Sequence, residues 1–62
     1  MKVEGENATR CDAVRLDSYA TVNAGGPLVS ADDETGAVSW RNKTGEVKSL
    51  TLGPHTIRIV PR

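Results

Sequence analysis

The chain has 62 residues, one cysteine and a formal net charge of zero, so it is long enough for one small domain but holds no intrachain disulfide. Its single histidine and single cysteine are too few for a structural zinc site, and no apolar run approaches the roughly 20 residues of a membrane helix. The zero charge is a cancellation, because residues 1–35 carry a net charge of −4 and residues 36–62 a net charge of +4, and this division suggests a charged partner.

A domain of this size buries only about 60% of the surface that its unfolded chain exposes, so its stability is marginal. With no disulfide or metal, a homodimer or a larger partner remains as external support. The first residues lack the apolar segment of a signal peptide, and the unpaired cysteine suits a reducing compartment. We therefore expect a cytoplasmic protein that has no membrane partner.

The polar segment at residues 1–8 has two interpretations, a flexible arm or a first edge strand. Residues 9–24 are also ambiguous. Apolar and polar side chains alternate through them, and a period of two predicts a strand. The spacing of Ala8, Cys11 and Val14 behind Asn7 favours a short capped helix instead. We favour the strand because the alternation is longer and continues through β-forming residues.

Ala24-Gly25-Gly26-Pro27 predicts a strong break, because glycine permits positive φ and proline donates no backbone hydrogen bond. Residues 28–31 form a short predicted strand. The acidic segment 32–36 predicts a solvated turn rather than a cation site, since no further oxygen ligands converge on it.

The last 27 residues are patterned most clearly. Residues 37–41 predict a strand with Val38 and Trp40 on one face, and residues 42–45 predict a turn that ends on a left-handed Gly45. The return strand, residues 46–52, switches its apolar face, which predicts a bulge near Lys48-Ser49. A tight turn at residues 53–55 and a final strand at residues 56–60 complete the chain.

These segments give five short strands with frequent turns, so the predicted fold class is all-β. The predicted architecture is a single domain over residues 1–62, a small five-stranded SH3-like barrel or a strongly bent antiparallel sheet. The expected core is aliphatic with one tryptophan: Val14, Leu16, Val22, Leu28, Val29, Val38, Trp40, Val47, Leu50, Leu52, Ile57, Ile59 and Val60.

The order of several short motifs resembles the YodC-like family of small uncharacterised bacterial proteins. The matching segments are Asp12-x-Val14-Arg15-Leu16-x-Ser18, Gly25-Gly26-Pro27, Val38-x-Trp40 and Ile57-x-Ile59-Val60. The sequence departs from the family pattern at Cys11, where the family has glycine, and in residues 19–24, which look inserted. The resemblance implies a similar fold and says nothing about activity.

No motif in the sequence predicts catalysis or a cofactor site. A nucleophilic cysteine needs a base within hydrogen-bond reach, and the single histidine, His55, is far from Cys11 along the chain. No phosphate-binding loop, nucleophile elbow or zinc-binding pair is present. We therefore expect no enzymatic activity, no cofactor and no metal.

A protein-interaction or assembly module is the function that we favour, since small barrels commonly dock partners through loops and edge strands. The composition also suits a phage or mobile-element product that acts on a host protein, and two copies would attract each other head to tail through their opposite charges. The alternative is a nucleic-acid-binding β-barrel with a basic C-terminal face. The predicted binding residues are Arg41, Lys43, Lys48 and Arg58, with Tyr19 as a further contact.

Overall fold

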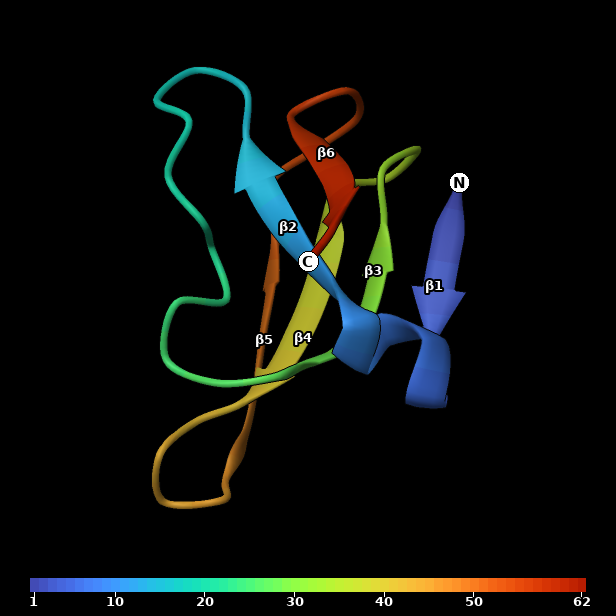
Figure 1. Ribbon diagram of the computed structural model, residues 1–62. Coiled ribbons are helices and arrows are strands. Elements are labelled where there is room, and N and C mark those ends of the chain that lie inside the picture. Colours follow the sequence, from blue (N-terminus) through green and yellow to red (C-terminus); the bar gives the residue numbers. More distant parts are fainter.

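Six short antiparallel strands form two sheets in the computed structural model, which describes residues 1–62 (Figure 1). The larger sheet has the order β1-β3-β4-β5 and the smaller sheet pairs β2 with β6. A 3₁₀ helix, η1, connects β1 to β2, and the pairing leaves open edges rather than a closed barrel. The elements are β1 (Lys2–Glu4), η1 (Gly5–Arg10), β2 (Cys11–Arg15), β3 (Leu28–Asp32), β4 (Ala37–Arg41), β5 (Val47–Thr51) and β6 (Ile57–Pro61).

The mostly β class is confirmed, and the number of strands is one higher than predicted. Each of the five predicted strands corresponds to one of β2 to β6. The sixth strand, β1, is the edge strand that was one alternative for residues 1–8, and it pairs antiparallel with β3 so that Val3 lies opposite Ala31. The chain therefore uses its polar first residues to extend the larger sheet.

The strand predicted over residues 9–24 is confirmed only for Cys11–Arg15. The short helix behind Asn7 does not form either, since η1 begins at Gly5 and Ala8 is the residue that it buries. The chain turns back from β1 into β2 at this point, and packing Ala8 against the sheet favours a tight 3₁₀ turn over a longer helix.

The loop at residues 16–27 covers the outer edge of β2. Its backbone bonds to β2 through Arg15 N to Ala20 O at 2.9 Å and Val22 N to Ala13 O at 2.9 Å. The side chain of Asn23, 2% exposed, accepts a further hydrogen bond from Ala13 N at 2.9 Å. The alternation in this segment thus reflects a loop that follows β2 rather than a longer strand.

The core is small and contains three alanines that the sequence analysis did not include. Four expected members, Leu28, Val38, Ile57 and Ile59, are buried, and Trp40 is half-buried against them. The prediction was wrong for Leu16, Val47 and Leu50, which are 37%, 50% and 43% exposed. The remaining core positions, Ala8 in η1, Ala13 in β2 and Ala31 in β3, carry only methyl side chains.

The hairpin of β4 and β5 has its predicted left-handed Gly45, with φ of 85°. The predicted bulge near Lys48-Ser49 is absent, because the register runs without interruption from Trp40 opposite Lys48 to Val38 opposite Leu50. Val47 lies on the outer face instead of the core face, so no change of register is needed. The bulge of this sheet lies in β3, where the register shifts between Leu28 and Ser30.

Candidate protein-interaction surface

The outer edge of β5 is an unpaired backbone edge along a strand whose residues are all exposed. All five of its residues are exposed, β5 ends the order β1-β3-β4-β5, and β4 is its only paired strand (Figure 1). In an antiparallel pair, alternate residues turn their N–H and C=O groups toward the partner and the others turn them away. The outer edge of β5 thus carries polar backbone groups that have no strand to bond.

The hydrogen bonds at the ends of the hairpin identify which residues face outward. Asn42 N donates to Glu46 O at 2.9 Å, and Leu52 N donates to Gly36 O at 3.0 Å. The backbone groups of the even-numbered residues of β5 therefore bond β4. The residues whose backbone N–H and C=O groups point away from β4, called outward-facing below, are Val47, Ser49 and Thr51.

The turn before β5 holds this edge in a fixed orientation. Asn42 Oδ1 accepts hydrogen bonds from Thr44 N at 3.0 Å and from Glu46 N at 2.9 Å. Arg41 Nη1 donates to Gly45 O at 2.8 Å, across the same turn. Because these bonds lie within the turn, they align β5 with β4 without help from other parts of the chain.

The two faces of β5 differ in character. Val47, Ser49 and Thr51 lie on the outer face of the sheet, where Ser39 Oγ and Ser30 Oγ are 2.6 Å apart on the neighbouring strands. Leu50 lies on the inner face, opposite the buried Val38. The inner face therefore carries an incompletely covered apolar surface at the edge of the core.

A small hollow continues this surface beyond the end of β5. Its volume is about 250 Å³, and apolar atoms of Leu16 and Leu52 form part of its wall. Arg15 Nη2 donates to Asp17 Oδ2 at 2.7 Å beside it, and this hydrogen bond holds the pKa of Asp17 below its usual value. His55 completes the rim in a left-handed conformation, with φ of 58°. The hollow has the size and lining to accept one aliphatic side chain.

A second hollow, lined by Asp12, Asn23 and Arg62 among others, is polar, and its charges are already paired. Asn23 Nδ2 donates to Asp12 Oδ1 at 3.1 Å, and Arg62 Nε donates to the same oxygen at 3.0 Å. No buried side-chain polar atom in the protein lacks a partner. This network ties the loop and the C-terminus to β2, which is a structural role.

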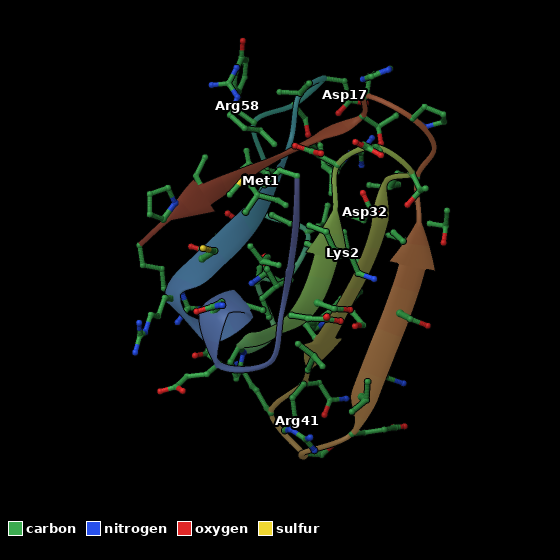
Figure 2. The ribbon with its side chains drawn as sticks, turned by 90° about the vertical axis from the view of Figure 1, so that its right-hand side faces the viewer. Met1, Lys2, Asp17, Asp32, Arg41 and Arg58 are labelled. Atoms are coloured by element: carbon green, nitrogen blue, oxygen red, sulfur yellow. The ribbon has the colours of Figure 1, made fainter.

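The predicted binding residues do not gather on one face. Arg41 and Lys48 lie on opposite faces of the larger sheet, because Lys48 pairs with Trp40 and Arg41 pairs with Val47. Arg58 lies on β6 in the other sheet, and Figure 2 places it at the opposite end of the molecule from Arg41. These residues therefore do not form the expected basic C-terminal face, because β6 pairs with β2 and not with the hairpin of β4 and β5.

The two other predicted contacts are isolated. Lys43 is exposed at the hairpin tip and forms no ion pair, whereas Lys48 Nζ lies 3.4 Å from Glu46 Oε2. Tyr19 is 79% exposed in the loop at residues 16–27, with φ of 55°. No second aromatic ring accompanies it there, because Trp40 is half-buried in the larger sheet.

The edge of β5 was not predicted, because Val47 and Leu50 were expected in the core and are both exposed. The signal was present in the apolar face switch along residues 46–52, which was interpreted as a bulge. Val47 and Leu50 lie on opposite faces of β5, and a lysine in the strand is common at an exposed sheet edge.

Cys11 and His55 lie at opposite ends of β2. Cys11 pairs with Pro61, while His55 is in the turn that follows β5 and lines the hollow beside Arg15. No group of three or more histidine, cysteine, aspartate or glutamate side chains is placed to hold a metal ion. The one helical segment is too short and too polar to cross a membrane.

No family model, no curated protein and no solved structure matches this chain.

Proposed function

We propose that this protein is a non-enzymatic protein-interaction module that docks an extended protein strand along the outer edge of β5. The observation that carries the proposal is a five-residue edge strand that is exposed throughout and has no partner on one side. Strand addition uses such an edge, because main-chain hydrogen bonds supply affinity and alternate side chains supply specificity.

The other edge of the same sheet makes a poorer docking site. β1 has three residues, and the two that face outward, Lys2 and Glu4, are charged and 4.0 Å apart at their ionic groups. Short strands and charged side chains discourage the pairing of an edge with another chain. β5 is longer, and its outward-facing residues Val47, Ser49 and Thr51 are uncharged.

The hollow beside Leu52 supports an added strand that continues past the end of β5. Leu50 and Leu52 lie on the same face, so an added strand that covers Leu50 reaches the hollow within about two residues. An aliphatic side chain of the partner would then contact Leu16 and Leu52. This pocket gives the interaction a sequence preference that backbone pairing alone lacks.

The nucleic-acid alternative has less support. Its cations, Arg41, Lys48 and Arg58, lie on different faces or different sheets, so they do not provide one phosphate-binding surface. Single-strand binders also use exposed aromatic residues for base stacking, and Tyr19 stands alone. Nucleic-acid binding therefore stays a prediction without a site.

We also propose that the strands have an SH3-like arrangement in which β5 is an unpaired edge strand. The order of pairing supports it, with β2 bonded to β6 and β3, β4 and β5 forming a meander. A long loop follows β2 and a tight turn precedes β6, and β2 lies against β3. In this arrangement β5 is an edge strand, and it is the strand whose five residues are all exposed.

A displayed library of random short peptides, selected against the protein, tests the proposal. We expect selected peptides to slow hydrogen exchange at the amides of Val47, Ser49 and Thr51. The amides of Lys48 and Leu50, which already bond β4, serve as internal controls and should change little.

Ser49→Pro should abolish peptide binding, because it removes one outward N–H and no bond to β4. Lys2→Pro is the matched control, since Lys2 also faces outward, at the opposite edge of the sheet. Peptides that protect amides elsewhere, or that bind both proline variants equally, would refute strand addition at β5.

A further inference from the structure

We propose that the strand accepted by β5 is β5 of a second copy of this chain, in an antiparallel pair centred on Ser49. The inference rests on the proposed function, since it uses the same edge. Two larger sheets would then join into one continuous sheet, with both small sheets packed against its inner face.

The outward-facing backbone groups define the register. Only odd-numbered residues face outward, so an odd residue of one copy must bond an odd residue of the other. Centring the pair on Ser49 places Val47 opposite Thr51 of the second copy and Thr51 opposite its Val47. All three outward-facing residues of both strands are then paired, with about six hydrogen bonds. A shift of two residues in either direction leaves one residue of each strand unpaired.

The side chains suit this register on both faces. On the outer face, Ser49 lies opposite Ser49 of the second copy, and small hydroxyl side chains pack directly opposite each other without repulsion. On the inner face, Lys48 lies beside Leu50 of the second copy, and its methylene stem covers part of the exposed leucine while its ammonium group stays in water. Leu50 therefore loses exposed apolar surface in both copies.

The charge distribution favours the antiparallel arrangement. The hairpin tip with Arg41 and Lys43 and the acidic turn at residues 32–34 lie at opposite ends of the larger sheet (Figure 1). In an antiparallel pair, the basic tip of each copy lies at the same end as the acidic turn of the other. The net charge of zero also means that no overall repulsion opposes the association of two copies.

The size of the contact sets its strength. An edge contact of five residues per copy lies at the low end of known interfaces, so we expect a dissociation constant on the order of 0.1 mM. Such a dimer forms at high local concentration, and a partner strand with better side-chain contacts could displace it. The interaction is therefore a reversible assembly step.

Sedimentation velocity over a concentration series tests the inference. We expect the weight-average mass to rise from the 6.6 kDa monomer toward twice that value between about 10 µM and about 1 mM protein. Ser49→Lys places two ammonium groups opposite each other at the centre of the pair and should keep the protein monomeric over the whole range. Because the Ser49 side chain is exposed, this variant keeps the fold. Ser18→Lys, at an exposed loop position, adds the same charge and should dimerise like the wild type.

A cysteine variant tests the register. In a Cys11→Ser background, Ser49→Cys brings two thiols together across the centre, where Cα atoms of a bonded pair lie about 5.5 Å apart, within disulfide range. Thr51→Cys should form far less disulfide-linked dimer, since its two copies lie roughly 13 Å apart in this register.

A monomer at about 1 mM, a Ser49→Lys variant that still dimerises, or equal crosslinking at both cysteine positions would each overturn the inference. The proposed function fails separately. If the protein is monomeric but selected peptides protect the Val47, Ser49 and Thr51 amides, β5 docks other proteins and not its own copy.

Discussion

Replacing Gly36 with alanine tests how the two turns at one end of the larger sheet are locked together. Gly36 is buried, its φ is 75°, and a Cβ atom there would meet Gly53 N at 2.6 Å and Thr56 Oγ1 at 2.8 Å. The left-handed conformation costs an alanine roughly 1–2 kcal/mol. Pushing the Gly53 backbone aside adds about 1–3 kcal/mol, as overpacking does in other cores. Gly36→Ala should therefore lower the free energy of unfolding by roughly 2–5 kcal/mol.

Gly45 offers a matched control. Its φ of 85° is equally left-handed, but nothing lies within 4 Å of the position that a Cβ atom would take. Gly45→Ala should cost only the conformational strain, roughly 1–2 kcal/mol. A domain of this length has a total stability of roughly 3–9 kcal/mol, so the first variant approaches complete unfolding while the second stays folded.

Urea denaturation followed by circular dichroism measures both variants. The difference between them isolates the contact of Gly36 with the turn at residues 53–56, since the conformational strain is common to both. Equal losses of stability would show that Gly36 does not pack closely against this turn. They would also contradict the hydrogen bond that Leu52 N donates to Gly36 O.

Three further variants test other parts of the structure. Asn23→Ala leaves the buried N–H of Ala13 without its acceptor, so we expect a loss of about 1–3 kcal/mol in urea denaturation and faster hydrogen exchange at that amide; unchanged exchange would contradict the network. Trp40→Ala removes a half-buried ring and should cost about 2–3 kcal/mol, less than for a fully buried tryptophan, and an unchanged denaturation midpoint would place the ring outside the core. Arg15→Gln should return the pKa of Asp17 toward its usual 3.8, as followed by carboxyl NMR titration. Because folding lowers this pKa, its stabilising effect is present above pH 3.8 and is lost as the pH falls through the folded value; an unshifted titration in the variant would show that Arg15 is not the cause.

The strands of the second half could be predicted because each is patterned locally. Val38 and Trp40 alternate with polar residues, and Gly45 marks the turn that follows, so the hairpin needs no information from the rest of the chain. The final strand was equally clear from Ile57 and Ile59, both of which are buried.

The first half could not be predicted in the same way because its structure depends on distant contacts. Ala8, Ala13 and Ala31 are buried in the core cluster, and nothing in their local sequence distinguishes them from surface alanines such as Ala24. Asn23 is polar and yet buried, because β2 needs an acceptor for one N–H and the loop supplies its side chain. Tertiary contacts determine which of these residues are buried, and the alternating sequence pattern does not predict that burial.

The binding surface predicted from the sequence differs from the one that we propose for a related reason. Charges are visible in a sequence, whereas the strand that ends a sheet is determined by topology. Arg41, Lys48 and Arg58 become neighbours only if the final strand adds to β5, but β6 pairs with β2 and leaves β5 at the edge. The pairing that separates the cations is therefore the same pairing that leaves β5 at the edge of the sheet.

An open edge carries a cost, and its persistence here argues for a role. Exposed edges risk aggregation, and proteins commonly protect them with short strands, proline, bulges or charged side chains, lysine above all. This chain places its bulge in β3 and its charged outward-facing residues in β1, while β5 has a regular register, no proline and a lysine whose backbone faces β4. Lys48 limits stacking of the inner face without blocking the edge itself. β1 is therefore protected by its short length and its two charged residues, whereas β5 is longer and carries Lys48 as its one charged residue, so its outer backbone groups remain accessible to the strand that we propose.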